Sequence, residues 1–144
     1  MTMDQGRRHM TASPAAIADT LLRPLALPAW NPLFSELTGS REPRIGDEYE
    51  LVLSVGLRGS FSYSSLDPER VGMTWQVPGM REESVWIIQA EADGCLVTHR
   101  LERTGPLAFV MGGGIRGVAH LRLERLARVA RNAAEPPDLP SLLV

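Results

Sequence analysis

The sequence predicts an α+β protein in which a curved antiparallel sheet of six to seven strands packs against a long C-terminal helix. Three observations support this fold class. Between residues 46 and 104, apolar and polar residues alternate in short runs separated by turn residues, as in antiparallel strands with one buried face. Two short helical segments precede these runs. An apolar stripe with helical spacing follows them.

The size and composition of the chain limit what it can be. The 144 residues suit one domain, expected over residues 1–132, followed by a proline-rich tail over residues 133–144. The net charge of −2 gives no electrostatic reason to expect nucleic acid as a partner. With a single cysteine, Cys95, the chain can form no internal disulfide, so a reducing compartment is expected. Because the apolar runs are too short to span a membrane and the basic N-terminus lacks the apolar segment of a secretory signal, we expect a cytoplasmic protein.

Two short helices are expected near the N-terminus. Ser13 can cap a helix whose first residue is Pro14, a position where proline is tolerated, and Pro24 ends this segment. A second short helix or turn, LALPAW, ends at Asn31, because the proline that follows disfavours helix in the residue before it.

The strands follow from period-two alternation. They are predicted within GDEYELVLSVGLRG, GSFSYSSLDPER, RVGMTWQVPG, SVWIIQAEADG and CLVTHRLERTG. Turn signals such as Asp67-Pro68 and Ala92-Asp93-Gly94 separate them. One face of the sheet collects the large apolar and aromatic side chains and is predicted to be buried: Tyr49, Leu51, Leu53, Val55, Leu57, Phe61, Tyr63, Val71, Met73, Trp75, Val77, Trp86, Cys95, Val97, His99 and Leu101.

The segment GGGIRG, residues 112–117, has the G-x-G-x-x-G spacing of dinucleotide-binding turns. Such a site also needs a parallel strand after the helix, with an acidic residue at the end of that strand. The residues after Gly117 hold a helix and then EPPDLPSLLV, which leaves no second strand. A nucleotide site is therefore not expected.

A helix is predicted from Pro106 to about Asn132. Gly114 falls on its apolar stripe, where a large side chain is usual. Two interpretations stay open: the glycines fray or kink the first part of the helix, or Gly114 leaves room for a ligand between helix and sheet. The other residues of the stripe are Leu107, Val110, Met111, Val118 and Leu121, with Ile115 at its edge.

Five segments carry a family resemblance: ASPAAIADTLL, LPAWNPLFSELTG, GDEYEL, TWQVPGMREESVWII and DGCLVTHRLERTGP. Over about residues 10–132, the chain resembles the START/birch-pollen-allergen superfamily, also called SRPBCC, and within it the polyketide cyclase/dehydrase-like group. The resemblance implies the helix-grip fold, in which the sheet wraps around the long helix and leaves an apolar cavity. Members bind sterols, lipids, plant hormones or polyketide intermediates, so a hydrophobic small molecule is the implied partner. A first strand should also precede Ser13, where GRRHMTA alternates poorly.

The buried face supplies the candidate catalytic and binding residues. His99 lies among aromatic residues and titrates near neutrality, so it could transfer a proton at a bound carbonyl compound with help from Tyr63 or Tyr49. The alternative is a neutral core histidine that is hydrogen-bonded to a tyrosine or to the backbone. Trp75 and Trp86 are as easily core residues as ligand contacts. The expected ligand-binding residues are Trp75, Trp86, Phe61, Met73, Leu53, Val97, Met111, Gly114, Val118 and Arg81.

Arginine bears on the choice between enzyme and carrier. Cyclases of the resembling group commonly hold an arginine inside the cavity, where it steadies an enolate or a carbonyl. Alternation along the strands leads us to expect no strand arginine facing inward. Arg81 is the nearest candidate and is expected at the cavity rim with Glu82 and Glu83.

The leading hypothesis is a cofactor-independent polyketide cyclase/dehydrase-like enzyme, in which the cavity orients a reactive chain and His99 moves protons. No metal is expected, because the three histidines lack the spacing of metal ligands. The rival hypothesis is a non-catalytic carrier or sensor of a lipid-like ligand, which the lack of an inward arginine favours. A third is a protein-interaction module, which an exposed apolar patch and a filled cavity would favour.

Overall fold

A computed structural model of the chain describes residues 1–110 and 114–134, which form one sheet and a set of helices. The strands are β1 (Thr2–Met10), β2 (Phe34–Thr38), β3 (Tyr49–Leu53), β4 (Arg58–Asp67), β5 (Arg70–Val77), β6 (Met80–Glu91) and β7 (Gly94–Thr104). The helices are α1 (Pro14–Leu21), the 3-10 turn η1 (Pro24–Ala26), α2 (Leu27–Trp30), α3 (Pro106–Val110) and α4 (Val118–Ala134).

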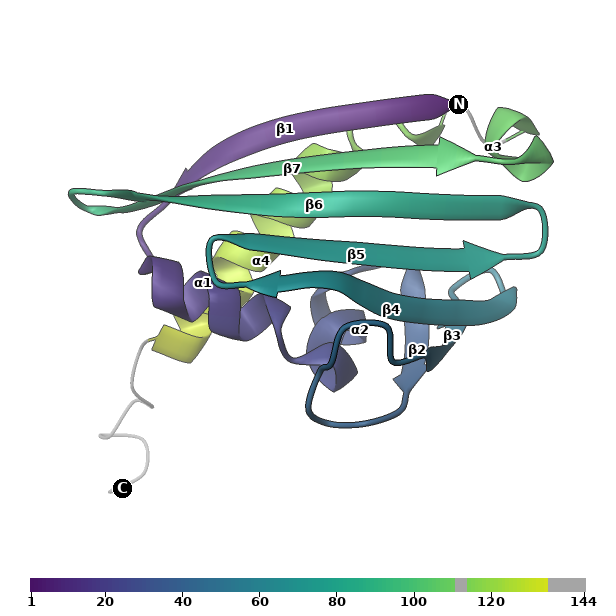
Figure 1. The fold of residues 1–144 in the computed structure, drawn as a ribbon. Coiled ribbons are helices and arrows are strands. Elements are labelled where there is room, and N and C mark those ends of the chain that lie inside the picture. The colour runs from purple at the N-terminus through teal and green to yellow at the C-terminus, as the bar shows by residue number, and fades with distance from the viewer. Residues whose placement is uncertain (111–113, 135–144) are drawn as a thin grey trace, which may run out of the picture.

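The seven strands lie in the order β1-β7-β6-β5-β4-β3-β2, and every neighbouring pair is antiparallel. Helices α1, α2 and α4 lie behind the sheet in Figure 1, and the face toward the viewer is uncovered. The predicted α+β class and the strand number are thereby confirmed. Among the described residues no pair of strands is parallel, so the sheet lacks the unit that a dinucleotide-binding turn needs.

The two short helices form as predicted. The hydroxyl of Ser13 accepts a hydrogen bond from the amide of Ala16 at 3.1 Å, and Pro14 is the first residue of α1. Helix α2 ends at Trp30, after which Asn31 is extended, as its following proline requires.

The first strand, which the family resemblance implied, is complete. β1 pairs with β7 along its whole length, with Thr2 opposite Arg103. Its alternation is weak because its inner face carries Asp4 and Gly6, small or polar residues over which α4 packs closely. A Cβ atom on Gly6 would lie 3.3 Å from Leu123.

The strand run predicted over residues 46–59 is shorter in the structure. β3 ends at Leu53, and Val55, predicted to be buried, lies in a turn with 66% of its surface exposed. A strand that we did not predict, β2, pairs with β3. A register shift between Phe34 and Glu36 interrupts its alternation, so it lacks the period that would reveal it.

The prediction of one helix from Pro106 to Asn132 is wrong in its first half. α3 ends at Val110, residues 114–117 are not α-helical, and α4 begins at Val118. Gly117 has a φ of 90°, a left-handed conformation that a right-handed α-helix cannot contain. The helix that packs on the sheet therefore starts after the glycines.

The placement predicted for Gly114 is also wrong. Gly114 is exposed, and a Cβ atom built on it would meet nothing within 4 Å. Leu121 of the predicted stripe is 39% exposed, whereas Ile115 is buried. Met111 lies outside the described residues.

The core fills the space between the sheet and the helices. α4 packs on β1 and β7, with α1 and α2 beside it (Figure 1). No helix among residues 1–110 and 114–134 has the length and apolar character needed to cross a membrane. The buried sheet face is confirmed for Tyr49, Leu51, Leu53, Phe61, Tyr63, Val71, Met73, Trp75, Val77, Trp86, Cys95, Val97, His99 and Leu101.

Candidate functional site

Four polar residues form a cluster at the inner face of β6, β7 and α4, which we call the buried charge cluster. Glu82 on β6, Arg103 on β7 and Arg122 on α4 are 1%, 4% and 3% exposed, and His99 on β7 has no exposed surface. Ionised groups are seldom buried to this extent unless they are paired. The cluster is therefore the part of the interior in which a specific chemical role is to be sought.

Glu82 is the centre of the cluster, and both of its oxygens are saturated. Oε1 accepts hydrogen bonds from Nε of Arg103 at 2.9 Å and from Nη2 of Arg122 at 3.1 Å. Oε2 accepts from Nη1 of Arg122 and Nε1 of Trp75, at 2.9 and 2.8 Å. Burial acts to raise the pKa of Glu82, but the charge and hydrogen bonds of Arg122, and then those of Arg103, lower it to about 2. Glu82 is thus ionised at neutral pH.

Strand alternation explains why these residues meet, and it corrects our expectation about arginine. Arg103 lies two residues beyond the buried Leu101 on the same face of β7, so the prediction that no strand arginine faces inward is wrong. Glu82 follows Met80 in the same way on β6 and stands opposite Arg103 in the register, not at a rim. Arg122 comes from the inner face of α4. Extending the alternation to the ends of β7 and β6 would have placed Arg103 and Glu82 on the inner face.

Arg81 points to the other side of the sheet. Its guanidinium is 3.0 Å from the carboxylate of Glu83, and about half of each side chain is exposed. Because β6 starts at Met80, alternation turns Arg81 and Glu83 outward and Glu82 inward. The predicted ligand-binding role of Arg81 thus has no contact with the interior to support it.

His99 is held on both ring nitrogens. Nδ1 lies 3.1 Å from the carbonyl oxygen of Val85, and Nε2 lies 3.3 Å from Nη1 of Arg122. A guanidinium can only donate, so Nε2 accepts and the ring proton is assigned to Nδ1. The imidazole also stacks on Trp86, with ring centroids 3.6 Å apart and planes at 16°. Burial, and next the charge of Arg122, lower the pKa of His99 to about 3, so the ring is neutral near pH 7.

The structure does not join the two predicted assisting tyrosines to His99. The hydroxyl of Tyr63 donates to the carbonyl of Leu21, and that of Tyr49 donates to the carbonyl of Ser40, each at 2.6 Å. Burial raises the pKa of both phenols. Tyr63 lies three strands from His99, which is roughly 14 Å across a sheet. The tyrosines anchor α1 and the segment before β3.

The predicted ligand contacts on the sheet form a packed interior. If a water molecule could fit into a void beside a side chain, part of that side chain would count as exposed. Met73 is 6% exposed. Of the remaining contacts, Val118 is partly buried, Gly114 is exposed and Met111 is outside the described residues. No more than 1% of the surface is exposed in Trp75, Trp86, Phe61, Leu53 and Val97, so the apolar cavity implied by the resemblance is filled there.

Two buried indole groups lack a hydrogen-bond acceptor among the described residues. Nε1 of Trp30 and Nε1 of Trp86 are both buried without a partner. The two rings meet edge to face, with centroids 5.6 Å apart. An aromatic face is a weak acceptor, so this contact does not replace a hydrogen bond. Sequence reasoning assigned Trp86 to the buried face but gave no indication that its N–H is unpaired.

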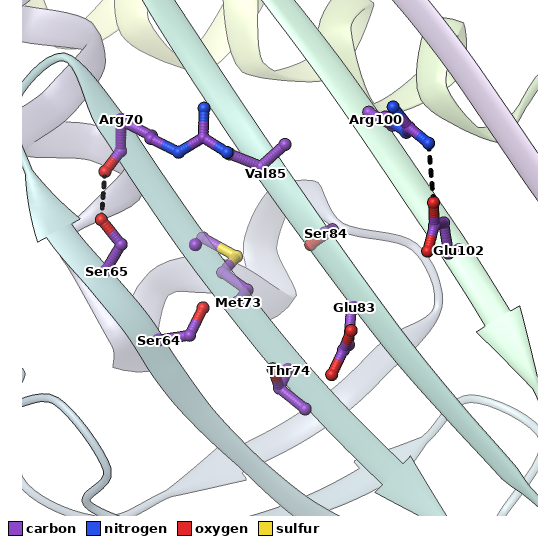
Figure 2. Close-up of a pocket in the computed structure, with 11 residues that line it drawn as sticks. Ser64, Ser65, Arg70, Met73, Thr74, Glu83, Ser84, Val85, Arg100 and Glu102 are labelled. Carbon is purple, nitrogen blue, oxygen red and sulfur yellow. Dashed lines mark hydrogen bonds and ion pairs between the residues drawn. The ribbon is translucent and has the colours of Figure 1, made fainter.

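One hollow on the described residues lies on the uncovered face of the sheet. It is a shallow groove of about 540 Å³ over β4 to β7, and Thr74, Glu83 and Arg100 are among the side chains that line it (Figure 2). A second outer groove of about 380 Å³ includes Arg81 and Ser62. His99 lines neither groove. No group of three or more metal-ligating side chains is arranged for an ion within residues 1–110 and 114–134.

Comparison with known proteins supports the fold. No family model matches the chain, and no curated protein matches it. A solved structure from Mesorhizobium loti is 13% identical, with a TM-score of 0.75 over 93% of this chain and 99% of its own. One from Chromobacterium violaceum is 20% identical, with a TM-score of 0.68 over 90% and 98%. A START superfamily protein from Mycobacterium smegmatis is 18% identical, with a TM-score of 0.64 over 89% and 93%. The chain therefore has the START-like helix-grip fold.

Proposed function

We propose that this protein binds a hydrophobic small molecule between the sheet and helices α1, α2 and α4, as a carrier or sensor and without catalysis. The helix-grip fold supports the location, because it sets a large apolar sheet face against helices. The observation that carries the proposal is the pair of buried indole N–H groups of Trp30 and Trp86, which have no acceptor among the described residues.

An unpaired buried donor costs about 1–3 kcal/mol, because it has given up water without gaining a partner. Because the two indole rings are in contact, the oxygen atoms of one bound ligand could accept from both donors. The packed interior must then open to admit the ligand. Met10, Met73 and Met80 are buried on this side of the sheet, and their unbranched side chains can adopt new rotamers at low cost.

The state of His99 argues for binding over proton transfer. A general base works best when its pKa lies near the working pH. The pKa of His99 is about 3, and Arg122 and the Val85 carbonyl occupy its two nitrogens. The enzyme hypothesis therefore lacks the proton-transfer group on which it depended.

An interaction module has less support. The interior is filled, which that hypothesis requires, but an apolar docking patch is also needed. Few large apolar residues of the described chain are exposed, and they come from five separate segments: Met1, Met3, Leu25, Ile45, Val55 and Leu121.

Titration with N-phenyl-1-naphthylamine, an uncharged probe that fluoresces in apolar surroundings, tests the proposal. Trp30, Trp75 and Trp86 are all buried in the interior, so a probe bound there should receive excitation energy from tryptophan. We expect saturable binding with one probe per chain and strong energy transfer. Linear, non-saturating fluorescence, or saturable binding without energy transfer, would contradict an interior site.

Displacement of the probe by hydrophobic compounds then separates a carrier from an enzyme. A displacing compound recovered after prolonged incubation should be chemically unchanged. Conversion of such a compound by the wild type, with loss of that conversion in His99→Gln, would establish the enzyme hypothesis instead.

A further inference from the structure

We infer that the ligand of this interior site carries a single carboxylate, which the terminal nitrogens of Arg103 bind. The inference rests on the proposed function, because that proposal supplies the apolar site in which the rest of the ligand would lie. Three observations carry it: the net charge of the buried charge cluster, the hydrogen bonds that Arg103 makes, and the side chains beside it.

The buried charge cluster has one more positive charge than negative. Arg103 and Arg122 are cations, Glu82 is an anion, and His99 is neutral because its Nε2 accepts from Arg122. A surplus charge with so little solvent around it favours an anion nearby, since the interior solvates it poorly. One carboxylate carries the single negative charge that would balance the cluster.

Other acidic side chains near the cluster are engaged elsewhere. The carboxylate of Asp4 on β1 accepts a hydrogen bond from the backbone amide of Ala119 at 2.9 Å, at the start of α4. Glu83 and Glu102 lie on the outer face of the sheet, where each forms an ion pair with an arginine of that face. Within the described residues, Glu82 is thus the one carboxylate that pairs with the two buried arginines.

Arg103 is the member of the cluster with unused hydrogen-bonding capacity. Arg122 grips Glu82 with both terminal nitrogens, whereas Arg103 reaches Glu82 only through Nε. Its Nη1 and Nη2 make no hydrogen bond to a described residue and are not among the fully buried unpaired atoms, so a ligand can reach them at the end of β7. These two nitrogens form the fork that binds a carboxylate in bidentate fashion. The guanidinium carbon lies 5.9 Å from the ring centre of Trp75, which limits its movement.

The surroundings of Arg103 suit an apolar tail. Two residues earlier on the same face of β7, Leu101 packs with Ile115 and Ala119 in a small apolar cluster under the start of α4. Arg103 is buried and is the second-last residue of β7, the strand whose end lies beside α3 in Figure 1. A carboxylate bound at Arg103 would have this apolar cluster next to its hydrocarbon chain, which enters the interior when the packed side chains move apart.

The test compares two probes of equal chain length, decanoate and 1-decanol, as competitors of N-phenyl-1-naphthylamine at pH 7. For the wild type we expect decanoate to bind at least tenfold more tightly than 1-decanol. Equal binding of the two compounds would overturn the inference and leave the proposed function intact. If neither compound nor the naphthylamine binds, the proposed function fails and the inference fails with it.

Variants then assign the preference to Arg103. Arg103→Met should lose the preference for decanoate, while Arg100→Met, on the outer face of the same strand, should keep it. Arg103→Met leaves Glu82 in its bidentate pair with Arg122, so we expect its melting temperature to stay within a few degrees of the wild type. A preference that persists in Arg103→Met overturns the inference.

A purely structural role for Arg103 predicts a different result. In that case Arg103→Met would melt far below the wild type or not fold at all, and the inference would rest on Arg103→Lys. This variant keeps the positive charge but has one ammonium group in place of the two terminal nitrogens of arginine. We therefore expect a reduced but measurable preference for decanoate. An Arg103→Lys variant that folds and binds both compounds equally would overturn the inference.

Discussion

Among the residues of the interior, Glu82 determines the geometry of the others. Its carboxylate accepts four hydrogen bonds from three side chains, which brings β5, β6, β7 and α4 to a common point. Arg122, held in this way, also occupies Nε2 of His99. Burial is the main cause of the low pKa of His99, and the charge of Arg122, which Glu82 holds in place, lowers that pKa further.

The pH dependence of stability follows from His99. Its pKa in the folded chain, about 3, lies below the ordinary value of 6.5, so on acidification the unfolded chain takes up a proton before the folded chain does. The stability that neutral His99 contributes to the folded chain is therefore complete above pH 6.5 and is lost progressively as the pH falls toward 3. We expect the free energy of unfolding to fall by about 2 kcal/mol between pH 7 and pH 5 from this residue.

Urea denaturation at several pH values measures this loss. His99→Gln keeps a donor and an acceptor near the two ring nitrogens but does not titrate, so the free energy of unfolding of this variant should vary less between pH 7 and pH 5. If wild type and His99→Gln lose the same free energy over that interval, His99 does not take up a proton on unfolding as described.

Residue-level prediction from alternation succeeded within the strands, but it failed at Val55, which lies beyond the end of β3, and it was not carried as far as Arg103. The inward orientation of Trp75, Trp86 and His99 follows from period two alone. The same rule extended by one step places Arg103 inside, but the predicted inward set of this strand ended at Leu101. Arg122 could not be found in this way, because its burial depends on the pairing with Glu82 across the interior.

At the scale of elements, glycine conformation decides where the C-terminal helix begins. Gly117 has a φ of 90° immediately before α4, while Gly114 has open space around it. We expect Gly117→Ala to lower the free energy of unfolding by about 1–2 kcal/mol, because alanine is strained in the left-handed region.

Gly114→Ala is the matched control, since a Cβ there meets nothing and no positive φ is required. Its free energy of unfolding should stay within about 0.5 kcal/mol of the wild type, as for other surface changes. Urea denaturation of both variants provides the measurement, and equal effects of the two substitutions would contradict this account of the start of α4.

Two strands, β2 and β1, are not revealed by apolar alternation, β1 having been expected from the family resemblance alone. β2 contains a register shift, so its burial does not alternate. β1 is an edge strand whose inner face is small or polar, with Asp4 and Gly6 beneath α4. Backbone pairing and packing against a helix hold these two strands in place. Their sequences therefore lack the regular apolar alternation by which a strand is recognised.

For the molecule as a whole, β1 completes the wall of the interior. It pairs with β7 and packs on α4, so it covers the edge of the strand that carries His99 and Arg103. We expect deletion of residues 1–10 to abolish the cooperative unfolding transition, because the inner face of β7 would lose its neighbouring strand and α4 would lose part of its support.

Near-ultraviolet circular dichroism and urea denaturation of the shortened chain test this expectation. Met3→Thr is the control, since Met3 is 48% exposed on the same strand and β-branched residues such as threonine are favoured in strands. A shortened chain that keeps the native near-ultraviolet spectrum would show that β1 is dispensable.

The pairing of β1 with β7 also means that the first strand is synthesised long before the strand with which it pairs. Met10 leaves the ribosome long before Cys95, its partner in the sheet, and Thr2 waits for Arg103. At translation rates of about 5–20 residues per second, the first strand stays without its partner for roughly 5–20 s. During that time its backbone can pair with other chains, and three of its residues, Arg7, Arg8 and His9, are polar side chains that discourage such pairing.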